Sequence, residues 1–385
     1  MKNRLIEIDN NRLMQDLEEM VSIPSIVGEE EKLANFLYQR LKEIGLKPKY
    51  QPVENKRKNV YAIYHFSENG PLLTFNGHMD TVPVSNGWET EPFKPVLNNE
   101  KLYGLGACDM KGGLAALLEA LRVIINSGKD LKGAIAFSGV VDEEAYSKGA
   151  KKLLSTEISN SRAIILGEPW FGDKDKPIHL GCTGKILYEL IAKGKAAHGF
   201  QPEKGINAIK EMARLLTSLD DLKKRKHPQF GEGNICILKI EGGYKKYSMV
   251  VPAACRAIIN RLIVPGETIQ IAIEDMKNLI EKLPLKANFE VISKPPSYNP
   301  FMLTEDEPIL RLFKDSYRTV LNIDPVFGYH RMITDANIFI GSAGIPTLVF
   351  GPRGGEIHSP NEYVEIETLT QAAEIYALTA IKYLS

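Results

Sequence analysis

The chain has 385 residues, a length that favours two domains over a single core. Its 48 Lys and Arg residues balance 48 Asp and Glu residues, so charge gives no support for a nucleic-acid partner or an anionic membrane surface. No apolar stretch approaches the roughly 20 residues that span a bilayer. The four cysteines are too far apart in the sequence for a disulfide framework or a thiolate zinc site. We therefore expect a cytoplasmic protein that binds neither nucleic acid nor membrane.

The first part of the chain predicts alternating helices and strands. Apolar spacing predicts helices over 11–21 and 29–44, strands over 49–53 and 59–66, and a buried helix over 112–125. Ser25 or Gly28 could open the second helix, and Gly128 could stop the buried one. This alternation, continued through Glu168, is typical of a doubly wound α/β domain.

The pattern changes near Gly181. From there the sequence predicts strands over 186–192, 234–240, 257–263 and 289–293, with helices over 207–219 and 269–283. A helix over 308–321 and a strand at Leu348 then resume the first pattern. We expect a discontinuous first domain formed by residues 1–181 and 297–385, interrupted by an inserted, compact αβ sandwich formed by residues 182–296.

Four apolar runs each end at a residue that can hold a metal ion: His78, the triplet Asp142-Glu143-Glu144, Glu168 and, after a Gly-rich loop, His358. A fifth candidate, Asp109, comes just before the predicted buried helix. Ligands in open α/β sheets collect beyond the carboxyl ends of the strands. Two histidines and several carboxylates at one sheet edge make a mixed N/O site, which suits zinc. The number of carboxylates indicates two ions.

Seven short strings stand in a characteristic order along the chain: Gly77–Pro83, Gly106–Gly113, Asp142–Glu144, Gly167–Pro169, Ala197–Gly199, Thr334–Ala336 and His358–Glu362. Together they resemble the dinuclear zinc aminoacylase and carboxypeptidase family. That family includes acetylornithine deacetylase, succinyl-diaminopimelate desuccinylase, aminoacylases and a glutamate-releasing carboxypeptidase. The resemblance covers nearly the whole chain. It implies a doubly wound, zinc-exopeptidase-like catalytic domain (residues 1–181 and 297–385) with an inserted ferredoxin-like α+β dimerisation domain (residues 182–296).

The resemblance implies a set of metal ligands. Asp109 would bridge two divalent ions, His78 and Glu168 would complete one coordination sphere, and Glu144 and His358 the other. Zinc is the expected metal, and cobalt or manganese could occupy the same ligands.

It also implies the groups that act on the substrate. Glu143 would be the general base, taking a proton from water and passing it to the leaving amine. Adjacent residues of an extended segment point to opposite sides, so Glu144 can bind metal while Glu143 faces the water. Asp80 would hold the imidazole of His78 in the correct tautomer. The family has a cis peptide after its bridging aspartate, so we expect one between Asp109 and Met110.

Two further roles are implied for the inserted domain. His198 would reach across a homodimer interface to stabilise the oxyanion in the partner's site, which makes the insert a dimerisation lid. Arg261 would clamp the substrate carboxylate with its planar fork of donors. The alternatives are a histidine that only shapes the turn beside Gly199, and an arginine that packs on the sheet of the insert.

Several positions depart from the family pattern. The family usually has Arg at Leu105, Thr or Ser at Cys108, and a substrate-holding Asn at Met249. Trp170-Phe171 replaces a common Thr and either walls a hydrophobic pocket or packs locally. Arg353 stands where Gly is common and either adds charge to the substrate rim or is simply exposed.

The expected reaction is cleavage of the amide bond of an N-acyl amino acid, and peptidase action on short peptides remains open because the same bond type is cleaved. A non-catalytic metal-binding protein on the same fold is a remote alternative, because no ligand or base is missing. A dinucleotide site at Gly104-Leu105-Gly106 is disfavoured, because the third glycine of that fingerprint would fall at Asp109.

Overall fold

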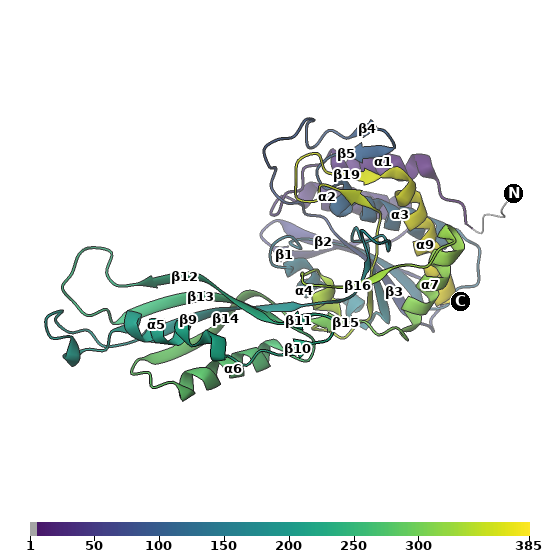
Figure 1. Cartoon of the computed structure of the whole chain (residues 1–385). Coiled ribbons are helices and arrows are strands. Elements are labelled where there is room, and N and C mark those ends of the chain that lie inside the picture. The colour runs from purple at the N-terminus through teal and green to yellow at the C-terminus, as the bar shows by residue number, and fades with distance from the viewer. Residues whose placement is uncertain (1–5) are drawn as a thin grey trace. The chain divides into compact units, whose positions relative to one another are not determined.

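The computed structural model describes residues 6–385, and the chain divides into two compact units (Figure 1). Unit 1 comprises the residues up to Leu180 together with Leu303–Gly328 and Thr334–Ser385, and unit 2 comprises Gly181–Met302 and Tyr329–Ile333. The segment expected as the insert, 182–296, falls inside unit 2. None of the helices within residues 6–385 has both the length and the apolar character needed to cross a membrane.

Unit 1 is built on a mixed sheet with the strand order β1-β2-β6-β3-β7-β17-β8. The strands are β1 (Lys49–Glu54), β2 (Arg57–His65), β3 (Leu72–His78), β6 (Ala134–Val140), β7 (Ala163–Leu166), β8 (Ile178–Cys182) and β17 (Thr347–Val349). Strands β6, β3, β7 and β17 are mutually parallel, whereas β1 and β2 are antiparallel to their neighbours. The expected α/β fold with a parallel centre is confirmed. The predicted ligands follow the carboxyl ends of its strands. The short strands β15 (Phe301–Met302) and β16 (Phe327–His330) pair with β8.

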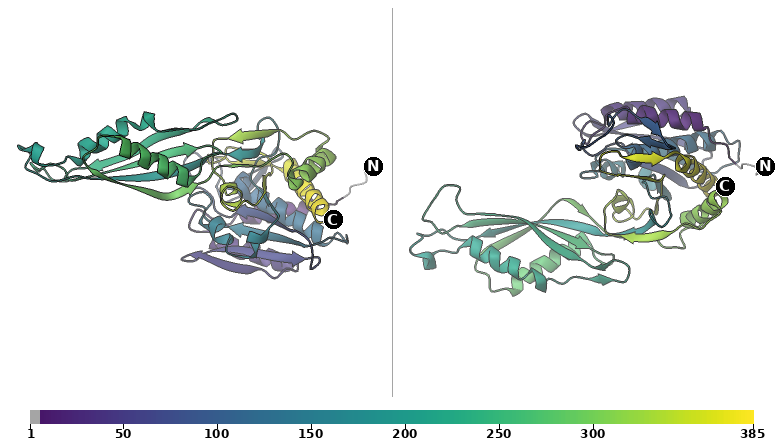
Figure 2. Two further views of the ribbon diagram at one scale, coloured as in Figure 1. Left: turned by 90° about the horizontal axis from the view of Figure 1, so that it is seen from below. Right: turned by 45° about the horizontal axis from the view of Figure 1, so that its top comes forward.

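Helices cover the sheet of unit 1 (Figure 2). They are α1 (Asn10–Val21), α2 (Glu31–Glu43), α3 (Gly113–Ile125), α4 (Lys148–Leu153), α7 (Pro308–Leu321), α8 (Ala336–Phe339) and α9 (Ile366–Leu384). As expected, α3 is buried on nearly all sides, because it packs against α1, α9 and β3. A Cβ on Gly113 would lie 1.8 Å from the carbonyl oxygen of Gly167, so only glycine lets the start of α3 approach the end of β7. Neither Ser25 nor Gly28 opens α2, which begins after Glu30.

A second, smaller sheet lies in unit 1 with the order β18-β19-β5-β4. Its strands are β4 (Val96–Asn98), β5 (Lys101–Tyr103), β18 (Gly354–Gly355) and β19 (Tyr363–Glu365). Pairing of β19 with β5 places the segment that carries His358 beside the turn that carries Asp109.

Unit 2 is a four-stranded antiparallel sheet of order β12-β13-β9-β14 with two main helices. Its elements are β9 (Gly184–Lys193), α5 (Ala208–Thr217), β12 (Asn234–Gly242), β13 (Ala254–Ile263), α6 (Ile269–Lys282) and β14 (Asn288–Tyr298), with a small hairpin of β10 (Lys226–His227) and β11 (Gly231–Glu232). The succession βαββαβ is that of a ferredoxin-like sandwich. The core of the unit lies between the helices and one face of β9 and β13.

Candidate metal centre

The five predicted metal ligands lie together beyond the carboxyl ends of the parallel strands of unit 1. Asp109 stands between the two histidines: His78 Nε2 is 3.0 Å from its Oδ1, and His358 Nε2 is 3.3 Å from its Oδ2. Glu144 Oε1 lies 2.8 Å from His358 Nε2, and Glu168 Oε1 lies 3.9 Å from His78 Nε2.

These ligand atoms form two groups that share one residue. His78, Asp109 and Glu168 make one group and Asp109, Glu144 and His358 the other, each with its donor atoms within 4.8 Å of one another. Glu168 Oε1 is buried and accepts no hydrogen bond from any residue in 6–385, an arrangement that costs free energy unless a cation compensates it. The residues present therefore fit two divalent ions with imidazole and carboxylate ligands.

The two histidines and Asp109 have shifted pKa values. Hydrogen bonds to Asp109 and Glu144 raise the pKa of His358 to about 10. Burial lowers the pKa of His78, but the hydrogen bond to Asp109 and nearby carboxylates outweigh it and raise that pKa well above its usual value. Burial raises the pKa of Asp109, but hydrogen bonds from both histidines outweigh it and bring it far below its usual range.

Two other carboxyl groups at the site have pKa values shifted upward. Burial raises the pKa of Glu168 well above its usual value, and burial together with the charge of Glu168 does the same for Glu143. Glu143 also belongs to a third group of close ligand atoms, with His78 and Glu144. A half-buried carboxyl group with a raised pKa beside these residues has the character of a proton acceptor.

Asp80 is buried beside the cluster but acts differently from expectation. His78 Nδ1 lies 2.9 Å from the backbone carbonyl of Asp80 and 3.9 Å from its carboxylate. The carboxylate instead accepts the backbone N–H groups of Glu143 and Glu144 at 3.2 and 2.9 Å. The main chain of Asp80 thus orients the imidazole of His78, while the Asp80 side chain fixes the turn that carries Glu143 and Glu144.

The Asp109 turn has the expected backbone. The peptide between Asp109 and Met110 is cis, as predicted. Gly106 opens the turn with a φ of +79°, and a Cβ there would lie 2.6 Å from Cγ2 of Thr81. Glycine is therefore required at the start of the turn.

The positions that depart from the family pattern are mostly packed. Cys108 and Leu105 are buried core residues. Phe171 is 5% exposed and packs against Phe350 and Tyr317, so it belongs to the core rather than to a pocket wall. The Trp170 ring lies 4.0 Å from the ring of His179.

Arg353 is held by two carboxylates of unit 1. It lies 2.7 Å from Asp173 and 2.7 Å from Glu365, so its charge is already paired.

Arg261 does not take the expected place. Every second residue of β13 points to the same face of the sheet. Ala257, Ile259 and Ile263 face the helices, and Arg261 lies on that same face. It is 1% exposed and donates to Glu267 at 2.6 Å and Asp275 at 3.2 Å. The expected carboxylate clamp is therefore contradicted: the guanidinium is buried and already paired, as in the alternative of an arginine packed on the sheet.

His198 lies in unit 2 and is exposed, and its backbone forms an isolated antiparallel β-bridge with Val250. Its Nδ1 accepts the N–H of Phe200 at 3.2 Å, and Phe200 is 79% exposed. Its role in a partner's site stays a prediction.

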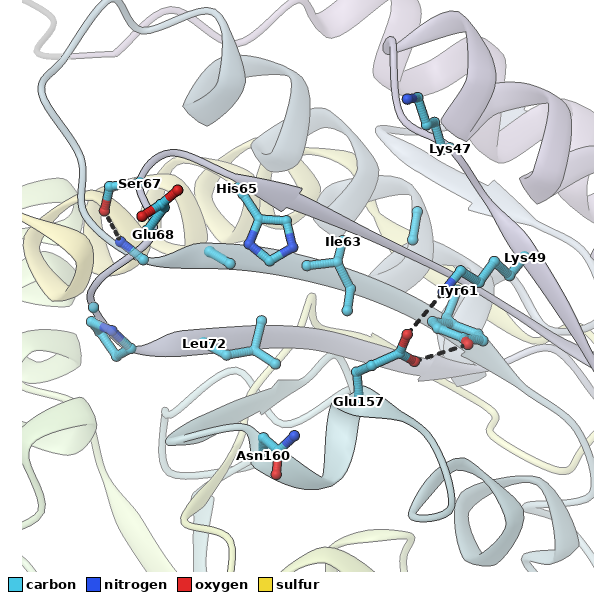
Figure 3. Close-up of a pocket in the computed structure, with 15 residues that line it drawn as sticks. Lys47, Lys49, Tyr61, Ile63, His65, Ser67, Glu68, Leu72, Glu157 and Asn160 are labelled. Atoms are coloured by element: carbon cyan, nitrogen blue, oxygen red, sulfur yellow. Dashed lines mark hydrogen bonds and ion pairs between the residues drawn. The ribbon is translucent and has the colours of Figure 1, made fainter.

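A groove of about 390 Å³ opens elsewhere in unit 1, beside the amino end of β3 (Figure 3). It is lined by Lys47, Tyr61 and His65, and by Lys49, which is paired with Glu157 across it. Because it lies at the edge of the sheet opposite the ligand cluster, it takes no part in the metal centre.

Three residues near the cluster were missed at the sequence level: Glu30, Arg57 and Glu362. Arg57 donates to Glu30 and to Asp142, the residue just before Glu143. Glu362 accepts N–H groups of the Asp109 turn. The string His358–Glu362 was a signal for Glu362, but nothing local indicates its partners.

Comparison with known proteins gives a consistent result. Residues 74–382 match the sequence model of peptidase family M20/M25/M40. Succinyl-diaminopimelate desuccinylase of Sulfurovum sp. is 28% identical over 376 residues, covering 95% of this chain and 97% of that protein. A tripeptidase of Staphylococcus aureus is 25% identical, with a TM-score of 0.73 over 98% of this chain and 99% of that one. A dinuclear metal-binding M20 peptidase of Bacillus subtilis, 18% identical, shares the fold with a TM-score of 0.71 over 97% of this chain and 98% of that one. The chain is a metal-dependent hydrolase that belongs to peptidase family M20/M25/M40.

Proposed function

We propose that this chain cleaves the amide bond of an N-acyl amino acid, in the manner of a deacetylase or desuccinylase, with two divalent metal ions and Glu143 as general base. The observation that carries the proposal is the position of Asp109, which is shared by two groups of ligand atoms. His78 and Glu168 complete one group, and Glu144 and His358 the other. Zinc is the proposed metal, because the ligands are imidazole nitrogens and carboxylate oxygens.

The chemistry follows from the residues of the cluster. When bound, two divalent ions supply Lewis acidity, which polarises the amide carbonyl and makes a water molecule more acidic. Glu143 takes the proton of that water and delivers it to the leaving amine. Asp80 keeps Glu143 in place by accepting its backbone N–H.

The relatives support two classes of substrate. The desuccinylase of Sulfurovum sp. covers nearly the whole chain, which favours an N-acyl amino acid. The tripeptidase of Staphylococcus aureus supports the alternative, a carboxypeptidase or dipeptidase acting on short peptides by the same mechanism. Both bonds are amides, so the same cluster serves either substrate.

We propose further that the protein is a homodimer joined through unit 2, with His198 serving the partner's site. Strand β12 is an edge strand, and it exposes Ile237, Leu238 and Ile240 at 42%, 57% and 52%. An exposed apolar edge strand is a ready surface for pairing with a second chain.

The test is a panel of N-acetyl, N-succinyl and N-formyl amino acids and dipeptides, assayed with zinc and with cobalt. Turnover of an acyl amino acid that depends on added metal supports the proposal. Turnover of dipeptides alone selects the peptidase alternative. Full activity after exhaustive chelation rejects metal-dependent chemistry at this site.

A further inference from the structure

Glu362 places a buried carboxylate directly against the backbone of the Asp109 turn. The residue is 1% exposed. Its Oε1 accepts the N–H groups of Cys108 and Asp109, both at 2.9 Å, and its Oε2 accepts that of Gly106 at 2.8 Å. Its backbone carbonyl accepts a fourth N–H, from Gly104, at 2.9 Å. One residue therefore satisfies four donors of the turn.

The conformation of the turn explains why an acidic side chain fits there. A left-handed residue followed by helical ones turns successive N–H groups toward one point, which makes a concave site for an anion. Gly106 supplies the left-handed conformation, with a φ of +79°. Glu362 thus fills the concave side of this turn with its two carboxyl oxygens, which accept three of its N–H groups.

The same short segment of the chain holds Asp109 in two places. His358 lies 3.3 Å from the Oδ2 of Asp109, and Glu362, four residues later, accepts its N–H. Strand β19 begins at Tyr363 and pairs with β5, which leads into the turn at Gly104. The side chain and the main chain of Asp109 are therefore set by one stretch of residues.

We propose that Glu362 is a positioning residue of the metal centre, which sets the direction of the Asp109 carboxylate shared by the two proposed ion positions. This inference rests on the function proposed above. Asp109 has to present one oxygen to each ligand group, so a rotation of its turn changes both groups at once. Residues behind the ligands commonly tune metal affinity in this way.

The test is Glu362→Gln with Glu356→Gln as the matched control. The glutamine keeps Oε1 for Cys108 and Asp109, but its Nε2 faces the N–H of Gly106, donor against donor. Glu356 is an exposed glutamate of the same loop. Cobalt affinity is measured by competition with a chelator, and the geometry by the visible absorption spectrum of the cobalt-loaded protein. We expect affinity about 10- to 100-fold weaker and an altered spectrum in Glu362→Gln, and wild-type behaviour in Glu356→Gln.

Each result has one meaning. Wild-type protein that binds no cobalt refutes the proposed function itself. Wild-type protein that binds two ions, with Glu362→Gln matching Glu356→Gln in affinity and spectrum, refutes the positioning role alone. A lower melting temperature in chelator with unchanged cobalt binding makes Glu362 merely structural and also overturns the proposal. If Glu362→Gln does not fold, Glu362→Asp keeps the charge but is one methylene shorter, and the same comparison applies.

Discussion

Arg57 holds together two buried carboxylates next to the turn that carries Glu143. It donates from Nε to Glu30 at 3.0 Å and from Nη1 to Asp142 at 2.7 Å. The residues Glu30 and Asp142 are 0% and 1% exposed, and Arg57 is 9% exposed. Asp142 has a φ of +75°, a left-handed conformation that needs support from its surroundings. We therefore expect Arg57→Met to destabilise unit 1.

The structure sets the magnitude of this loss. Removing one partner of a buried ion pair leaves an uncompensated charge and costs about 3–5 kcal/mol. Lys49 and Glu157 form a comparable pair on the surface, with side chains 58% and 52% exposed. Breaking an exposed pair costs about 0–1 kcal/mol, so Lys49→Met is the matched control. Adding Glu30→Gln and Asp142→Asn to Arg57→Met removes the stranded charges and should restore part of the stability.

The assay is urea unfolding followed by tryptophan fluorescence. Both tryptophans of the chain, Trp88 and Trp170, lie in unit 1, so their emission follows that unit. Midpoint differences multiplied by the common slope give the change in unfolding free energy. An Arg57→Met variant no less stable than Lys49→Met would refute the view that the buried pair holds this region.

Three further predictions concern the metal centre of unit 1 and the edge strand β12 of unit 2. Glu143→Gln should keep both metal ions, measured by elemental analysis, and lose kcat by about 10²–10⁴-fold; loss of metal together with activity would instead make it a ligand. In the metal-free protein the pKa of His358 is raised to about 10, so its stabilising contribution is full below pH 6.5 and disappears as the pH rises through 10. Metal binding at pH 8 should therefore release protons, seen by calorimetry in buffers of different ionisation enthalpy, and equal heats would contradict this. Ile240→Lys should convert dimers into monomers in sedimentation at equal concentration, because a lysine on an exposed edge opposes strand pairing; an unchanged mass would place the interface elsewhere.

Elements with strong local signals could be predicted from the sequence. The helix α7 begins and ends where expected, because Pro308 suits its first position and Asn322, in a left-handed conformation, closes it. The inner strands β3, β6 and β7 appear as short apolar runs because both their faces are buried.

Features that depend on pairing between distant segments could not be predicted. Strands β5 and β19 have three residues each, too few for a period, so the contact of Glu362 with the Asp109 turn has no local signal. The motif around Arg261 gave its position along the chain but not its face, and a shift of one residue in a strand exchanges the two faces. The role of the Asp80 side chain depends on where the loop after β6 runs, which is a tertiary property.

The late return of the chain to unit 1 affects how the protein is made. During synthesis β7 leaves the ribosome long before Thr347–Val349, the strand that covers its open side. Synthesis of the four-stranded sheet of unit 2 is complete at Tyr298, so this sheet can form before unit 1 is complete. Until β17 is made, β7 has one unpaired edge, which is a hazard for aggregation. Yield in cells should therefore respond to chaperone supply and to the speed of translation over the last ninety or so residues.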